Sequence, residues 1–382
     1  MDNLTHSLVG LAASKAGLEK LSPGATFLCV IAANAPDSDI AVRLFGDRWL
    51  ALHHHRGITH SILGTLIIGL TIPLVFFLID RLIAIVRARQ PAFKLKGMLV
   101  ASVVVGATHP LLDWTNNYGV RPLLPWSSEW FYGDLIFIID PFLWLVLGGA
   151  VFLTTSKTKP TLIFWLLLAS ILTYLIIASP VRRGFESTLL LKSYWVVGLI
   201  AIVILFKLRA GFRWGRQIVI IAFAVILIYA MTLSLLHRVA INNARILALG
   251  IASQSGESVT DVAAMPTLAN PLRWLSVVET ERAAYRFEVS LGKPRGVTTT
   301  PVRYERADIL ISPTVARATQ DRRAKFFLDF ARFPVARVVD PDCLTQTLVQ
   351  FADLRYTEPG RSRGTFTLEV PIECPISVDE QQ

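Results

Sequence analysis

Long apolar runs separated by short polar segments fill most of the first 240 residues of the chain. A helix needs about 20 apolar residues to cross the hydrocarbon core of a bilayer. The runs therefore predict an all-α polytopic membrane bundle over this part of the chain. The six predicted spans are 61–86, 97–112, 136–155, 161–179, 188–206 and 217–236.

Two shorter apolar runs precede these spans, at 4–16 and 25–35. Between them lie Gly17, Pro23 and Gly24, residue types that end one helix and begin the next. We expect a helical hairpin packed against the bundle. The lengths of its two arms leave open whether the hairpin spans the membrane.

The pattern changes near residue 240. Short runs with strand character alternate with stretches that contain Pro, Thr and Arg, and "DRRAKFFLDFARF" at 321–333 predicts one amphipathic helix. We therefore expect a membrane domain over 1–239 and a small soluble α+β domain over 240–382.

Composition agrees with a membrane protein, since 53% of the residues are hydrophobic and only 17% are charged. Soluble domains carry about one quarter charged residues. The net charge of +10 would suit nucleic acid if it formed one basic face. However, basic and acidic residues balance from residue 240 onward, and the excess lies in short loops between apolar runs. We therefore expect no nucleic-acid partner, and a lipid bilayer instead.

The basic loops also orient the chain. They lie at 87–96, 156–160 and 207–216, and positively charged loops stay on the cytoplasmic side. The N-terminus has Asp2 but no basic stretch, so no cleavable signal is expected. The segments then expected outside the cytoplasm, across an inner membrane, are 53–60, 109–135 and everything after residue 237.

This topology bears on the cysteines. Cys343 and Cys374 lie in the tail, and disulfides persist in an oxidising envelope compartment. A bridge closing their loop of about 30 residues would stabilise the tail by roughly 3–4 kcal/mol. We expect this disulfide, and the alternative is two unpaired cysteines in a cytoplasmic tail. Cys29 lies in an apolar run, where a core position is expected.

Histidines and acids gather at the edges of the N-terminal apolar runs. Six of the seven histidines precede residue 110, and four of them fall in "HHHRGITH" at 53–60. The topology places these edges on the outer side of the membrane. The polar residues concerned are His6, Asp37, Asp39, His53, His54, His55, His60, His109, Asp113 and Asp134.

Their spacing indicates a metal site. His109 and Asp113 are four residues apart and so project from one face of a helix. Imidazole and carboxylate bind zinc, manganese or iron, and nitrogen ligands favour zinc. We expect one or two divalent ions, and zinc is the metal that the ligand types favour most. The predicted ligands are Asp37, His60, His109 and Asp113, followed by His6 and Asp39.

Simpler interpretations apply to single members of this set. His53 and His54 suit solvated interfacial positions, the histidine run could be a surface cluster, and Asp37 and Asp39 could be solvated at a helix end. The constellation is more specific than any member. Motifs for a nucleophile elbow, a phosphate loop or a zincin helix are absent from the sequence, so catalysis without a metal is less favoured.

The motifs "MDNLTHSLVG", "NAPDSD", "HHRGITHS", "HPLLDWTNNYGVRPLLPWS" and "IIDP" follow one another over residues 1–150. In order and spacing they resemble the YdjM-like family of inner-membrane metal-dependent hydrolases. The later spans and the tail extend beyond the short family core. The positions that match the family motifs are Thr5, His6, Asn34, Pro36, Asp37, Asp39, His55, Arg56, Gly57, Thr59, His60, His109, Asp113, Asn116, Gly119, Asp134 and Asp140.

These observations favour a membrane-bound hydrolase acting on a lipid or lipid-linked phosphoester at the outer surface. His55 or Asp134 could serve as general base or as a further ligand, and Arg56 could hold a phosphate or carboxylate group. A metal-handling transporter is the alternative, although transport sites usually lie near the bilayer midplane. A third interpretation is a scaffold with a structural metal site.

Overall fold

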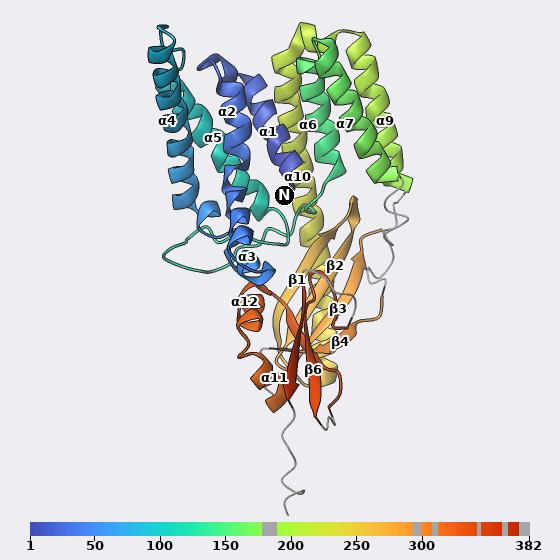
Figure 1. Ribbon diagram of the computed structural model, residues 1–382. Helices are drawn as coiled ribbons and strands as arrows, with labels where there is room; N and C mark the ends of the chain where they lie inside the picture. Colours follow the sequence, from blue (N-terminus) through green and yellow to red (C-terminus); the bar gives the residue numbers. More distant parts are fainter. Residues whose placement is uncertain (178–188, 293–298, 308–311, 342–344, 361–365, 374–382) are drawn as a thin grey trace, which may run out of the picture. The chain divides into compact units, whose positions relative to one another are not determined.

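The computed structural model describes residues 1–177, 189–292, 299–307, 312–341, 345–360 and 366–373. Its helices and strands are drawn in Figure 1. Cys343 and Cys374 lie outside the described residues, and so does the disulfide expected between them. Contacts divide the chain into two compact units. The first comprises Met1–Ser38, Arg56–Leu235 and Pro266–Pro271, and the second Asp39–His55, Leu236–Met265 and Leu272–Gln382.

The first unit is helical, as the apolar runs predicted. Short 3-10 segments connect some of its helices, namely η1 (Leu18–Lys20), η2 (Ala35–Leu44) and η3 (Ile58–His60). Only the part of η2 up to Ser38 belongs to this unit. The helices are α1 (Asn3–Ala16), α2 (Ala25–Asn34), α4 (Ile62–Val86), α5 (Leu95–Trp114), α6 (Pro141–Thr155), α7 (Lys159–Ile177), α9 (Leu189–Lys207) and α10 (Ala210–Ser255), the last contributing its residues up to Leu235.

Six segments of the described chain are long and apolar enough to cross a membrane. They include Ala25–Leu44, so the second arm of the expected hairpin, continued by η2, reaches spanning length. The span predicted at 136–155 is wrong in its start, because the helix begins only at Pro141 and has 15 residues. The carboxylate of Asp140 accepts hydrogen bonds from the backbone of Phe142 and Leu143 and thereby fixes this start.

The two arms of the hairpin approach each other closely at Gly10. A Cβ atom added there would lie 2.7 Å from the carbonyl oxygen of Cys29 and 3.0 Å from the Cβ of Ala33. Cys29 itself is fully buried, as its apolar surroundings predicted. Gly24 begins α2 with a φ of 77°, a left-handed conformation that glycine adopts without strain. The turn therefore depends on Gly24, and the tight packing of α1 against α2 depends on Gly10.

Many apolar side chains on α4, α7 and α9 are exposed, including Leu82, Phe164 and Val197. A soluble protein rarely leaves so many large apolar groups in water. In a bilayer these side chains would contact lipid tails, which are as apolar as leucine. The exposed apolar surface therefore agrees with a multi-pass membrane protein.

The second unit combines helices with two small antiparallel sheets, in the orders β1-β2-β3-β4 and β5-β6-β7. Its helices are α3 (Arg48–His54), α11 (Pro313–Ala318), α12 (Arg322–Phe330) and the end of α10 from Leu236. Its strands are β1 (Val259–Thr267), β2 (Asn270–Thr280), β3 (Ala283–Ser290), β4 (Val302–Glu305), β5 (Pro334–Val338), β6 (Gln346–Asp353) and β7 (Thr367–Glu373).

The end of α10 forms one face of this unit's core. Ala240, Ala244 and Ala248 recur every four residues and so share one face of the helix. All three are buried in one cluster with Trp274 and Phe287 of the first sheet. The small alanine side chains allow the helix to lie close to the large aromatic residues.

Helix α3 belongs to the second unit, although it precedes most of the membrane helices in sequence. Its Trp49 ring meets the ring of Phe327 on α12 edge to face, with centroids 5.9 Å apart. Nδ1 of His53 lies 3.1 Å from a carboxylate oxygen of Asp329 on the same helix. The tail unit therefore includes Asp39–His55, which the sequence had assigned to the membrane domain.

We expect Gly10→Ala to lower the thermal unfolding midpoint of the purified protein in detergent. The added methyl group would overlap the backbone of α2, and overpacking of this kind costs about 1–3 kcal/mol. Gly106→Ala is the matched control, because its new Cβ would lie 3.8 Å from the nearest atom, an ordinary contact. Equal midpoints for the two variants would contradict the close approach of α1 and α2.

Candidate metal centre

Four ligand side chains come together from three separate elements of the first unit. Asp37 lies in η2 directly after α2, and His60 is the last residue of η3. His109 and Asp113 occupy the last turns of α5, four residues apart on one face of the helix. One ligand atom from each of the four lies within 4.8 Å of every other. The predicted convergence of these residues is therefore present.

The distances within the cluster suit a small ion. Nε2 of His60 lies 3.4 Å from Oδ1 of Asp37 and 3.3 Å from Oδ2 of Asp113. The Nε2 atom of His109 is 3.5 Å from each of the same two oxygens, and the two Nε2 atoms are 3.1 Å apart. Zinc bonds of about 2.0–2.2 Å in a tetrahedron require edges of roughly 3.3–3.6 Å. The four distances between histidine nitrogens and carboxylate oxygens match such edges, and the two Nε2 atoms lie slightly closer together.

The outer nitrogens of the two histidines are held by hydrogen bonds. Nδ1 of His109 lies 2.6 Å from the carbonyl oxygen of Ala33, which can only accept. The proton is therefore on Nδ1, and the lone pair of Nε2 faces the cluster, as a metal ligand requires. Nδ1 of His60 has the hydroxyl of Thr59 at 3.1 Å. The Nε2 lone pair of His109 and the two carboxylates converge at this place, so the residues present fit a divalent metal.

Arg56 holds Asp113 in place. Its Nε and one terminal nitrogen each lie 3.0 Å from a different carboxylate oxygen of Asp113. The other terminal nitrogen donates to the carbonyls of Asp113 and Gly119 and to Oδ1 of Asn116, at 3.0–3.2 Å. The guanidinium is buried over the ring of Tyr118. Its contacts in the structure are those of a positioning residue, and the predicted contact with substrate stays a prediction.

His6 lies beside the four ligands. Its ring stacks on that of His109, with centroids 3.7 Å apart, and its Nε2 lies 3.3 Å from Oδ1 of Asp113. Within the described chain neither ring nitrogen of His6 makes a hydrogen bond. Burial, reinforced by His109, lowers the pKa of His6 far below its usual range, so the ring is neutral and able to bind a metal. The amino nitrogen of Met1 also contacts Oδ1 of Asp113.

The remaining predicted site residues are outside the group of Asp37, His60, His109 and Asp113. Oδ1 of Asp39 pairs with Nδ1 of His55 at 3.0 Å, and both residues belong to the second unit. Asp134 is buried in the connection between α5 and α6, with a left-handed φ of 52°. It is outside the four-residue group. The assignments of Asp39 as a ligand and of His55 and Asp134 as catalytic residues stay predictions.

Asn116 and the backbone of Ala33 contribute to the site without having been predicted to do so. Asn116 was noted only as a family motif position, although its side chain is fully buried and accepts from both Arg56 and the amide of Tyr118. The available signal was an Asn three residues after a candidate ligand, in "DWTNNYG". The carbonyl of Ala33 had no signal, because any residue type supplies one.

Apolar helices of spanning length and a buried His/Asp cluster at helix ends define a multi-pass membrane protein with a candidate metal centre. Residues 1–183 match the family described as YdjM inner membrane protein. Residues 1–183 are therefore similar to the YdjM inner membrane protein family, which confirms the resemblance carried by the motifs of the chain. The family and the apolar helices together indicate an inner-membrane location.

Two named relatives match a similar share of the chain. The first, the uncharacterized protein YfhP of Bacillus subtilis (strain 168), is 25% identical over 174 residues, which cover 43% of this chain and 49% of YfhP. The inner membrane protein YbcI of Escherichia coli (strain K12) is 29% identical over 160 residues, which cover 41% of this chain and 81% of YbcI. The chain thus matches about half the length of YfhP and most of YbcI. No solved structure matches the chain.

We expect His109→Ala and Asp113→Ala each to reduce bound metal from stoichiometric amounts to background, measured by elemental analysis of purified protein. Each change removes one corner of a four-ligand set. His53→Ala is the control histidine variant, because His53 contacts Asp329 in the second unit. It should retain the metal. Equal losses in His53→Ala and His109→Ala would show that the cluster is not the metal site.

Proposed function

We propose that this protein is a membrane-bound metal-dependent hydrolase. The observation that carries the proposal is the set of ligand atoms from Asp37, His60, His109 and Asp113, which all lie within 4.8 Å of one another, with three of the four residues buried. These residues would hold one divalent ion, with His6 available as a further nitrogen ligand. Zinc suits the nitrogen-rich set best.

When bound, a divalent metal would act as a Lewis acid and lower the pKa of a water to about 7. The chain's residues orient this chemistry. Ala33 and Thr59 fix the two imidazole rings through their outer nitrogens, and Arg56 fixes Asp113. Loss of such supporting contacts typically weakens metal sites or activity 10- to 100-fold.

The four ligands are not equally buried, and this difference supports access of water and substrate to the site from one direction. The side chain of Asp37 is 15% exposed, whereas those of His60, His109 and Asp113 are at most 1% exposed. Water and substrate would therefore approach on the Asp37 side. A general base must come within hydrogen-bonding reach of the attacking water. His55, held by Asp39, and Asp134 remain the candidates for this role.

The proposed substrate is a lipid or lipid-linked phosphoester. The cluster lies at the C-terminal end of α5 and just before the start of α4, both candidate membrane spans. The ends of spanning helices lie at the level of lipid headgroups, where a phosphoester linkage is found. A site at this level favours a lipid phosphoester over a soluble substrate.

A structural metal or a transported ion is the second candidate, and a specific observation favours it. Structural zinc sites are closed by four protein ligands, whereas catalytic sites keep an open position. Four ligand residues already surround the candidate ion here, with His6 beside them. The two functions differ in turnover, which can be measured directly.

Metal analysis of the purified protein, paired with a screen of phospholipid and lipid-linked phosphoesters, tests the proposal. We expect about one divalent ion per chain and hydrolysis that disappears on chelation and returns with zinc. Because the ligands bind metal only when deprotonated, metal content should fall as the pH is lowered. Stoichiometric metal with no turnover on any phosphoester would favour the structural or transport function.

We further propose that the cluster and the tail unit are extracytoplasmic, as the basic loops imply. In Figure 1, α4, α6 and α9 end at the same end of the first unit, in agreement with loops that alternate between sides. In a variant with Ser at all three cysteine positions, Thr158→Cys and Arg282→Cys both introduce exposed thiols. An impermeant maleimide should label intact cells at position 282 and not at 158. The reverse pattern would invert the orientation.

A further inference from the structure

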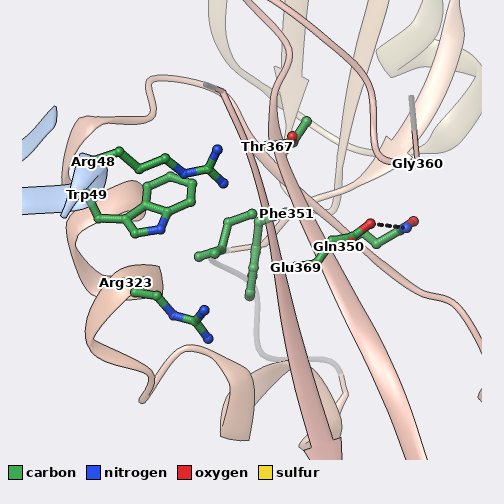
Figure 2. A pocket seen from close by; sticks show the side chains of 9 residues that line it. Arg48, Trp49, Arg323, Gln350, Phe351, Gly360, Thr367 and Glu369 are labelled. Atoms are coloured by element: carbon green, nitrogen blue, oxygen red, sulfur yellow. Dashed lines mark hydrogen bonds between the residues drawn. The ribbon is translucent and has the colours of Figure 1, made fainter. Parts of the chain in front are cut away.

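The second unit contains a cavity of about 410 Å³ bordered by α3, α12 and the strands β6 and β7 (Figure 2). This volume lies in the usual range of small-molecule sites, about 300–1,000 Å³. Three buried apolar side chains, Trp49, Phe351 and Leu368, form part of its lining. The other lining residues, mainly polar, are Arg48, Arg323, Gln350, Gly360, Thr367 and Glu369.

Arg48 offers its donors to this cavity. Its guanidinium carbon lies 4.3 Å from the centre of the Trp49 ring, which holds the side chain in place through a cation–π contact. Among the described residues Arg48 has no ion pair and no side-chain hydrogen bond. The adjacent Asp47 is engaged by the backbone of Trp49 and Leu50, at the start of α3. Arg48 therefore has guanidinium N–H groups at the cavity that donate to no described residue.

Arg323 adds a second guanidinium from a different helix. Its Nε and one terminal nitrogen donate to Asp321, at 3.1 and 2.7 Å, while the other terminal nitrogen makes no hydrogen bond to the described chain. In Figure 2 both guanidinium groups extend from the helices toward the strands, one on each side of Trp49. A ligand in the cavity would thus meet donors from two directions.

We propose that this cavity binds an organic phosphate. Two guanidinium groups on separate helices suit a tetrahedral phosphate, whose oxygens point in several directions, whereas one planar fork satisfies a carboxylate. The cavity is too large for phosphate alone, and its apolar side chains provide a surface for an organic body. Glu369, which accepts a hydrogen bond from Gln350 at 3.0 Å, disfavours a second anionic group at the strand side.

Calorimetric titration of the full-length protein in nanodiscs of neutral lipid, stripped of metal by chelation, tests this site separately from the hydrolase function. Phenyl phosphate is the probe, with benzyl alcohol as a neutral analogue. We expect phenyl phosphate to bind and benzyl alcohol to give no measurable heat. Arg48→Gln and Arg323→Gln should each weaken binding about tenfold or more, since each removes charge-assisted hydrogen bonds.

Arg322→Gln is the matched control, because Arg322 is the neighbouring residue on α12, is exposed, and stacks on Phe326 instead of lining the cavity. This variant should bind phenyl phosphate as the unaltered protein does. Equal weakening in Arg322→Gln, or no weakening in the Arg48→Gln, Arg323→Gln double variant, would overturn the proposal. Failure of the unaltered protein to bind both phenyl phosphate and phosphatidic acid would also overturn the proposal.

Two further measurements complete the test. Modification of the unaltered protein with phenylglyoxal requires no variant to fold, and bound phenyl phosphate should protect Arg48 and Arg323 but leave Arg322 reactive. Unprotected Arg48 and Arg323 would contradict the site. Competition by phosphatidic acid in the nanodiscs, and none by phosphatidylcholine, would identify a lipid phosphate as the source. Competition by inorganic phosphate or soluble phosphomonoesters alone would identify a soluble ligand.

Discussion

The ion pair between Arg56 and Asp113 is the interaction on which the candidate centre depends. Both groups are buried, and burying charges is costly unless their geometry and remaining hydrogen bonds are complete. Here the carboxylate receives a two-pronged contact, and the second terminal nitrogen of the guanidinium has three oxygen acceptors. Asp113 is therefore held in one orientation. Because His109 shares its helix face, the orientation of α5 aligns both ligands at once.

The same interaction lies where the chain passes between its two units. The chain leaves the first unit after Ser38, one residue beyond the ligand Asp37, and re-enters it at Arg56. The intervening segment packs through Trp49 and His53 on α12. Arg56 therefore directly follows a segment that folds with the tail, and Asp37 precedes the same segment with only Ser38 between them.

Sequence patterns were sufficient where the chemistry is local or periodic. The spans follow from apolar length, and the convergence of His109 and Asp113 follows from their spacing on one helix. The start of α6 was missed because apolar character continues through Ile136–Ile139, whereas the cap formed by Asp140 fixes the helix at Pro141. The membership of α3 in the tail unit could not be predicted, because it rests on a contact between Trp49 and Phe327, far apart in sequence.

Charge balance connects the proposed ion with the proposed substrate. Two carboxylates, those of Asp37 and Asp113, lie at the cluster with one guanidinium, that of Arg56. Burial lowers the pKa of His6 and that of the Met1 amino group well below their usual ranges, so both groups are neutral. The residues alone thus carry an excess of one negative charge, which attracts a cation into a poorly solvated site. A divalent ion would turn this into an excess of one positive charge. A monoanionic phosphodiester would then neutralise the centre, whereas a neutral ester would leave a net charge buried beside lipid, at considerable cost.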